Sequence, residues 1–121
     1  FAAAVAELDP IYSDEAAARA AGHPTVPAPP TFAFSLGLLA PAEKGSVVEM
    51  VDNVGGVLHG EQHFTYHKMI YAGDVIRLKT KTVDIYEKKG GKLDFIVQDT
   101  TAHNQHGDLC VSSRTIVVVR N

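Results

Sequence analysis

The chain has 121 residues, of which 45% are hydrophobic and 21% are charged, and its formal net charge is −3. These values are typical of one globular domain and exclude an intrinsically disordered chain. The negative balance argues against nucleic acid and anionic membrane surfaces as partners.

The N-terminal region is predicted to be helical. Small helix-forming residues over 1–8 indicate a short helix. A second helix is predicted within 13–23. There Ser13 is in the position of an N-cap, two acidic residues follow in the first turn, and Gly22 ends the helix.

A proline-rich segment separates these helices from the next one. The run PTVPAPP at 24–30 contains four prolines, which excludes a helix or a central strand and predicts a stiff extended loop. The run TFAFSLGLLAPA at 31–42 predicts a helix that other structure surrounds, because it has no polar face. It is too short to span a bilayer, so no membrane is predicted as a partner. A further short helix or turn is predicted over 46–53.

Beyond Val57 the hydrophobic pattern changes to the period of two that is typical of β-strands. Four runs rich in Val, Ile, Thr and aromatic residues occupy 57–68, 74–88, 92–104 and 108–120. The runs KKGGK and NQHGD predict hairpins between the last three, and YAGD predicts a turn from the first to the second. Helices followed by this antiparallel meander predict an α+β fold, a curved antiparallel sheet wrapped around the central apolar helix.

Three histidines, His59, His63 and His67, recur at every fourth residue. On a helix they would share one face and indicate a metal site, but on a strand successive histidines lie about 13 Å apart. The strand is the favoured interpretation, so we predict a polar strand face and no metal site. The sequence has no glycine-rich nucleotide motif and no Gly-x-Ser-x-Gly nucleophile motif, and no cofactor is predicted.

The number of cysteines indicates the cellular compartment. Cys110 is the single cysteine and lies in the apolar run LCVSSRTIVVVR. One cysteine forms no internal disulfide, which fits a reducing, cytoplasmic setting. A nucleophilic role stays open for Cys110, but burial in a strand is the favoured interpretation.

The segment ELDPIY at 7–12 has the frame of an acid/base signature. Two carboxylates, Glu7 and Asp9, precede a ring side chain, Tyr12. Proton transfer at neutral pH needs a group that titrates near that pH, as histidine does and tyrosine does not. The segment therefore predicts the outline of a proton-transfer site without its working base.

Several landmarks along the chain carry a resemblance to a known family. They are DPIYSDEAAARAAGH, VPAPPTFAFSLG, LHGEQHFTYHK, YAGDVI and SSRTIVVVR. In this order and spacing they resemble the MaoC-like family of hot-dog-fold enoyl-thioester hydratases and 3-hydroxyacyl-thioester dehydratases. The chain looks most like the N-terminal, non-catalytic half of such proteins. The resemblance covers essentially all of the chain and implies a hot-dog fold.

The catalytic signature of that family reads Asp, any residue, Asn, Pro, any residue, His. Glu7 falls at the position of its Asp, Asp9 at the position of its Asn, and Tyr12 at the position of its His. The resemblance thus implies a substituted catalytic pair at these positions. It also implies that the start of the central helix lies beside an acyl tunnel. The substrate-binding residues expected there are Pro30, Thr31, Phe32 and Phe34.

The resemblance implies a domain that binds acyl thioesters, of CoA or of acyl-carrier protein. It would support (R)-3-hydroxyacyl dehydration or enoyl hydration in cytoplasmic fatty acid metabolism. The working acid/base pair is expected from a partner, in a heterodimer with a catalytic MaoC-like half or in a homodimer. A second copy or a partner would also cover the free edges of a four-stranded sheet.

Two alternatives stay open. One is a homodimeric module that binds acyl chains or lipid without catalysis. The other is a hot-dog thioesterase in which Glu7 or Asp9 activates water. In every case residues 1–121 are expected to form one MaoC-like domain, from which the first strand of the family is missing.

Overall fold

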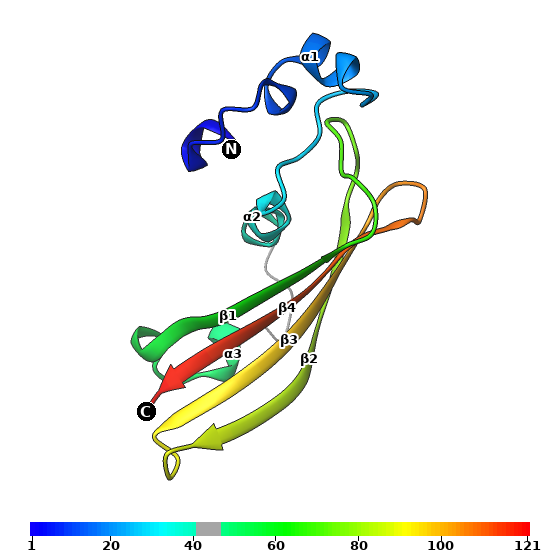
Figure 1. Ribbon diagram of the computed structural model, residues 1–121. Helices are drawn as coiled ribbons and strands as arrows, with labels where there is room; N and C mark the ends of the chain where they lie inside the picture. Colours follow the sequence, from blue (N-terminus) through cyan, green and yellow to red (C-terminus); the bar gives the residue numbers. More distant parts are fainter. Residues whose placement is uncertain (41–46) are drawn as a thin grey trace.

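The computed structural model of the chain describes residues 1–40 and 47–121. Its elements in chain order are η1 (Ala3–Val5), η2 (Pro10–Tyr12), α1 (Glu15–Ala20), α2 (Phe32–Leu39), α3 (Val47–Met50), η3 (Val54–Gly56), β1 (Val57–Tyr66), β2 (Arg77–Lys88), β3 (Leu93–His103) and β4 (Leu109–Arg120). Helices in the first half and four strands in the second confirm the predicted α+β order (Figure 1). The expectations for Pro41, Ala42 and Ser46 lie outside the described residues.

The four strands form one antiparallel sheet in the order β1-β4-β3-β2. The predicted meander is therefore wrong in one respect, because β1 pairs with β4 and not with β2. The predicted turn at YAGD does form, with the Asp74 amide donating to the Tyr71 carbonyl at 3.0 Å, but the whole connection over 67–76 is too long to be a hairpin. It crosses the end of the sheet and binds the proline-rich segment, where the Ala28 amide donates to the Ile70 carbonyl at 2.7 Å and the Ala72 amide to the Val26 carbonyl at 2.9 Å.

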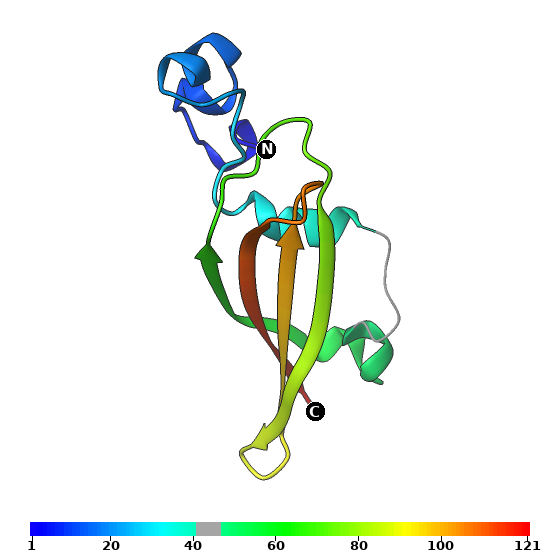
Figure 2. The ribbon, with the colours of Figure 1, turned by 90° about the vertical axis from the view of Figure 1, so that its right-hand side faces the viewer.

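Both helices α2 and α3 lie against the same face of the curved sheet (Figures 1 and 2). Under α2, the buried residues Ile70, Ala102, Cys110 and Val111 form one apolar cluster. Under α3, the buried residues Ile96, Val117 and Val119 form a second cluster. Cys110 has no exposed surface, as predicted for a strand residue. The core is thus one layer between helices and sheet.

The helix α2 packs on the first of these clusters through Ala33 and Leu36. Its other side is open, and Leu38 and Leu39 are 73% and 76% exposed. The prediction that other structure surrounds this helix is therefore wrong for the single chain. The reason is geometric, since one open sheet covers one side of a helix and leaves the opposite side to solvent or to a partner.

A β-bulge between His59 and Glu61 changes the face on which the histidines lie. His59 is paired with the core residue Val117 and stacks on Phe34 of α2, with ring centroids 5.2 Å apart. The extra residue reverses the alternation, so His63 lies on the opposite face. The prediction of one shared histidine face is wrong. Across 1–40 and 47–121, no three His, Cys, Asp or Glu residues group as a metal site.

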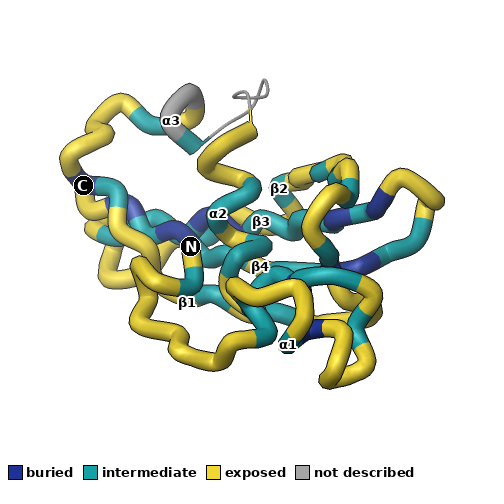
Figure 3. Tube along the Cα trace, turned by 90° about the horizontal axis from the view of Figure 1, so that it is seen from above, coloured by how far each residue is buried: buried dark blue, intermediate teal, exposed yellow. Residues whose placement is uncertain are grey.

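The N-terminal region is held mainly by local hydrogen bonds and is largely exposed (Figure 3). The predicted helix over 1–8 is reduced to the single turn η1. The cap of α1 is Asp14, whose carboxylate accepts from the Ala16 and Ala17 amides, so the prediction of Ser13 as N-cap is wrong by one residue. Gly22 ends the helix as predicted, at φ +94°. None of the described helices is long and apolar enough to cross a membrane.

Candidate functional site

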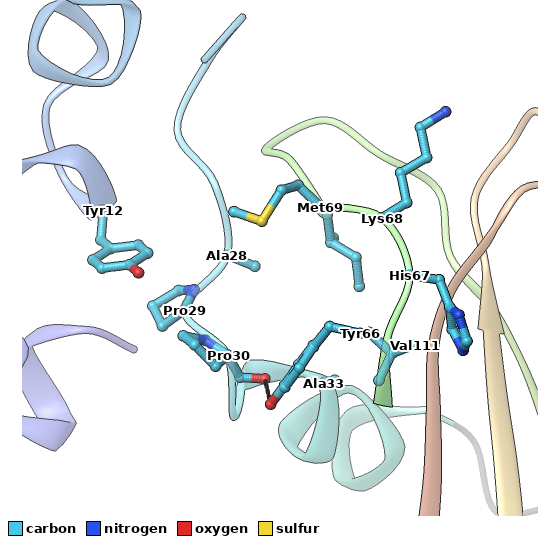
Figure 4. Close-up of a pocket in the computed structure, with 11 residues that line it drawn as sticks. Tyr12, Ala28, Pro29, Pro30, Ala33, Tyr66, His67, Lys68, Met69 and Val111 are labelled. Carbon is cyan, nitrogen blue, oxygen red and sulfur yellow. Dashed lines mark hydrogen bonds between the residues drawn. The ribbon is translucent and has the colours of Figure 1, made fainter. Parts of the chain in front are cut away.

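A pocket of about 350 Å³ lies where the N-terminal segment, the start of α2 and the 67–70 segment after β1 meet (Figure 4). Its lining consists of Tyr12, Ala28, Pro29, Pro30, Ala33, Tyr66, His67, Lys68, Met69, Ile70 and Val111. We call it the proline pocket, because the proline-rich segment forms one wall. The walls are mainly apolar. The polar side chains are that of Tyr12 on the N-terminal segment and those of Tyr66, His67 and Lys68 on the opposite wall. A volume of this size is in the range of small-molecule sites.

Two cross-chain contacts fix the walls of the proline pocket. Pro27 forms an isolated antiparallel bridge with Tyr71, which holds the proline-rich segment beside the 67–70 segment. The Tyr66 hydroxyl donates to the Pro30 carbonyl at 3.0 Å and ties the end of β1 to the start of α2. Burial raises the pKa of Tyr66, so this hydroxyl keeps its proton at neutral pH. The sequence supports this geometry because prolines keep the segment extended.

Of the three residues of the acid/base signature, only Tyr12 lines the proline pocket. Its ring points toward Pro29 and Pro30 in Figure 4. Asp9 is instead the N-cap of η2, and its carboxylate accepts from the Ile11 amide at 3.1 Å. The carboxylate of Glu7 accepts from the Asp9 amide at 3.0 Å. Both carboxylates bind backbone of their own segment, so the fold does not bring them together with Tyr12 in the pocket.

The four residues expected to bind substrate have different surroundings. Pro30 lines the pocket, whereas Thr31 is exposed at the start of α2. The ring of Phe32 packs against the phenylalanine at the N-terminus, with centroids 5.2 Å apart. Phe34 stacks on His59 at an interplanar angle of 20°. Only Pro30 therefore belongs to the lining of the proline pocket, and the roles of the other three in binding stay predictions.

The polar residues at the rim of the proline pocket, His67 and Lys68, were not predicted as site residues from the sequence. His67 shares a hydrogen bond of 3.1 Å with the Ser112 hydroxyl of β4. Lys68 donates to the Asp108 carboxylate at 2.7 Å, which raises the pKa of the lysine and lowers that of the aspartate. The only signal in the sequence is that both residues end the strand-like run over 57–68, where polar side chains gather at a sheet end. Their partners lie in β4 and the turn before it, which the sequence does not reveal.

The arrangement suits binding more than proton transfer. No carboxylate is among the residues that line the proline pocket in the described part of the chain. General acid/base catalysis needs two groups that exchange a proton with the substrate at hydrogen-bonding distance. An apolar pocket with a few polar groups on one side is typical of a site that holds an apolar chain and orients its polar end.

Comparison with known proteins identifies the family. The family model of the FAS1-like dehydratase domain region matches residues 1–112. The chain belongs to this family. A UPF0336 protein of Streptomyces griseus is 36% identical over 120 residues, which cover 99% of this chain and 79% of that protein. A second relative is the 3-oxo-4,17-pregnadiene-20-carboxyl-CoA hydratase alpha subunit of Mycobacterium tuberculosis. It is 33% identical over 95 residues, which cover 71% of this chain and 30% of that protein.

Solved structures agree with this family of dehydratase domains. A MaoC-like dehydratase superposes with a TM-score of 0.83 at 28% identity, over 99% of this chain and 36% of that one. A chain of the HadBC (3R-hydroxyacyl-ACP dehydratase) complex of Mycobacterium tuberculosis superposes with a TM-score of 0.81 at 27% identity, over 98% and 81% of the two chains. The predicted hot-dog fold and MaoC-like resemblance are thus confirmed. The protein is a MaoC-like hydratase or dehydratase domain.

Proposed function

We propose that this MaoC-like domain binds an acyl thioester in the proline pocket and supports hydration or dehydration that a catalytic partner subunit carries out. The observation behind the proposal is the separation of the acid/base signature. Tyr12 faces the pocket, while the carboxylates of Glu7 and Asp9 are engaged by backbone amides. A syn addition of water across an α,β-double bond needs an acid and a base on the same substrate.

The pocket walls support an acyl chain as the group that is bound. Proline, alanine, methionine and isoleucine side chains present carbon to the cavity. Each methylene of an acyl chain that leaves water there contributes about 0.8 kcal/mol. The polar thioester end then lies toward the rim, where His67 and the Lys68–Asp108 ion pair are held in place. The hydroxyl of Tyr12 would bind and orient the substrate through hydrogen bonds.

Assembly with a second hot-dog subunit is part of the proposal. Two of the similar solved structures are complexes of two different subunits, HadBC and ChsH1-ChsH2 of Mycobacterium tuberculosis. In the present chain β1 and β2 are the edge strands, and α2 exposes Leu38 and Leu39. A catalytic MaoC-like half with an intact Asp/His pair would cover such surfaces. A homodimer, a cytoplasmic location and a role in fatty acid metabolism remain predictions.

Turnover of the isolated protein and of its mixture with a catalytic MaoC-like subunit tests the proposal. The substrates are crotonyl-CoA and a longer enoyl-CoA, and the loss of the double bond is followed by absorbance. We expect no turnover by this chain alone and turnover by the complex. The proposal is wrong if the isolated chain hydrates these substrates rapidly and Tyr12→Phe or Glu7→Gln abolishes that activity. The chain would then contain a complete site.

A matched pair of variants tests the role of the proline pocket. Met69 is 41% exposed and lines the pocket, so Met69→Trp fills it at little risk to folding, and we expect the KM of the complex for the longer enoyl-CoA to rise about tenfold or more. Leu8 is 89% exposed and outside the lining, and Leu8→Trp is expected to change nothing. Equal KM values for both variants would contradict acyl binding in this pocket.

The same samples separate the alternative functions. Native mass spectrometry that finds a homodimer carrying lipid, with no hydratase activity in any mixture, would favour a lipid-binding module. Release of free thiol from acyl-CoA by the isolated chain would favour a thioesterase. Either result would replace the proposed function.

A further inference from the structure

We propose that a second pocket, on the other side of the Lys68–Asp108 ion pair, binds phosphoryl groups. This pocket has a volume of about 490 Å³ and lies between the start of β2 and the β3–β4 turn. Its lining consists of Val75, Arg77, Lys79, His103, Asn104, Gln105, His106 and Gly107. We call it the turn pocket. It shares no lining residue with the proline pocket.

The lining of the turn pocket is basic in a chain whose net charge is negative. Arg77 and Lys79 are two residues apart on β2, so their side chains leave the sheet on the same face about 7 Å apart. His103 is the register partner of Arg77 on β3. The lining has two full positive charges, two imidazoles and no carboxylate. Clefts lined by one sign of charge concentrate ligands of the opposite sign.

The two carboxylates that flank the lining residues in sequence, Asp74 and Asp108, are bound by other groups. Asp74 accepts from the Tyr71 amide at 2.9 Å and from the Gln105 side chain at 3.0 Å. Asp108 is held by Lys68 at 2.7 Å. Neither Arg77 nor Lys79 has a salt bridge within 1–40 and 47–121. The two cations are therefore available to an anion from outside the described chain.

The turn that forms the other wall is closed by hydrogen bonds to the Asn104 side chain. The side-chain oxygen of Asn104, itself 8% exposed, accepts from the His106 amide at 3.0 Å and from the Asp108 amide at 3.1 Å. Gly107 has φ +80°, which lets the chain reverse tightly. The backbone of His106 is thus held in place at the turn. A preorganised site loses less entropy when the ligand arrives.

The donor set favours phosphate over a single carboxylate. A guanidinium forks onto two phosphate oxygens, an ammonium binds as a point charge, and each imidazole offers at least one N–H. Such a set matches a group with two negative charges and three oxygens. The volume is larger than one phosphate needs, so it also admits a phosphorylated organic molecule.

Two kinds of ligand could bring a phosphoryl group to the turn pocket. One is a free phosphate compound. The other is the phosphate-bearing end of the thioester carrier, because Lys68 borders the proline pocket while Asp108 follows Gly107 of the turn pocket. The second source rests on the proposed function. The phosphate site itself does not, since none of its residues lines the proline pocket.

The test is an NMR titration of the ¹⁵N-labelled full chain with pyrophosphate, and then with CoA and with pantetheine, which lacks phosphate. We expect saturable shifts at Arg77, Lys79 and 103–107, and about a tenfold or greater loss of affinity in Arg77→Gln/Lys79→Gln. Arg77→Lys keeps the charge and should lose less. The matched control is Lys89→Gln/Lys92→Gln, which removes the same charge at the distant β2–β3 turn and should retain affinity.

Each outcome decides between the possibilities. If CoA binds more tightly than pyrophosphate and pantetheine does not bind, the site belongs to the thioester carrier. If CoA binds equally or more weakly than pyrophosphate, the site belongs to free phosphate compounds. No saturable shift, shifts centred elsewhere, or the same loss in the control would overturn the proposal. Met69→Trp should leave pyrophosphate binding unchanged, so failure of acyl binding is distinguished from failure of this site.

Discussion

The N-terminal segment and the four-stranded sheet show two different ways to hold a chain in place. Over 1–23 only Ala18 is buried, and the side chains of Glu7, Asp9 and Asp14 accept hydrogen bonds from amides two or three residues away. The sheet instead joins residues far apart in sequence and buries a core against α2 and α3. The segment with the catalytic signature is thus held largely by contacts within the segment itself.

This difference shows that the signature segment and the sheet are stabilised by different kinds of contact. A cap or a tight turn works with a few neighbouring residues, so its side chains can be exchanged at small cost to the fold. A substitution in a core strand also affects the strands that pack or pair with it on both sides. Glu7 and Asp9 make such local contacts, so we expect exchanges at these two positions to leave the hot-dog fold intact.

The largest expected effect concerns the sheet and compares two isoleucines that are register partners, Ile96 on β3 and Ile85 on β2. Ile96 is 4% exposed in the core, whereas Ile85 is 57% exposed at the sheet edge. We expect Ile96→Ala to lower the free energy of unfolding by about 2–5 kcal/mol and Ile85→Ala by less than about 1 kcal/mol. Urea unfolding measures both. Equal losses would mean that a partner or another segment buries Ile85 in solution.

A smaller effect is expected at the bulge of β1. A Cβ at Gly60 would lie 2.8 Å from the Val118 side chain and 3.0 Å from the Ile116 carbonyl oxygen, so we expect Gly60→Ala to destabilise by about 1–3 kcal/mol. Gly37, inside α2, has nothing within 4 Å of such a Cβ, and Gly37→Ala is expected to stabilise by about 0.5–1 kcal/mol. Thermal unfolding compares the two. A tolerated Gly60→Ala would show that the bulge is not held in this geometry.

The smallest effect concerns the N-terminal segment. Removal of the cap in Asp14→Ala should weaken α1 by about 1 kcal/mol, whereas Ser13→Ala should leave it unchanged. Hydrogen exchange at Ala18 and Ala21, whose amides bond within this turn, reports the change. The midpoint of global unfolding should move little. If Ser13→Ala accelerates exchange as much as Asp14→Ala, the cap assignment is wrong.

Prediction from the sequence worked where the signal is local or periodic. The four strands were found from the period of two, and Gly22 was found as a helix end because glycine tolerates positive φ. The cap was misplaced by one residue, since Ser13 and Asp14 are both good cap residues and the backbone geometry decides between them. Tyr12 lines the proline pocket, and its role as a site residue stays a prediction.

The order of the strands and the faces of β1 needed the tertiary structure. A hydrophobic period of two shows that each residue lies on the opposite face of the strand from its neighbours. It does not show which strand lies alongside or where a bulge reverses the alternation. The bulge after His59 and the pairing of β1 with β4 are such features. The polar rim at Lys68 depends on this pairing, because its partner Asp108 comes from the turn before β4. The turn pocket depends instead on the pairing of β2 with β3 and on the turn between β3 and β4.

By itself the sequence determined the fold class and the family resemblance, since these rest on residue types and their spacing along the chain. The substituted catalytic pair stays a prediction. Only the tertiary structure decided that Tyr12 meets the proline-rich segment while Glu7 and Asp9 turn to their own backbone. It alone also gathered Arg77, Lys79 and His103 at one turn. The physical reason is that a site is a set of distances through space, and those distances are fixed by strand pairing and burial that involve the whole chain.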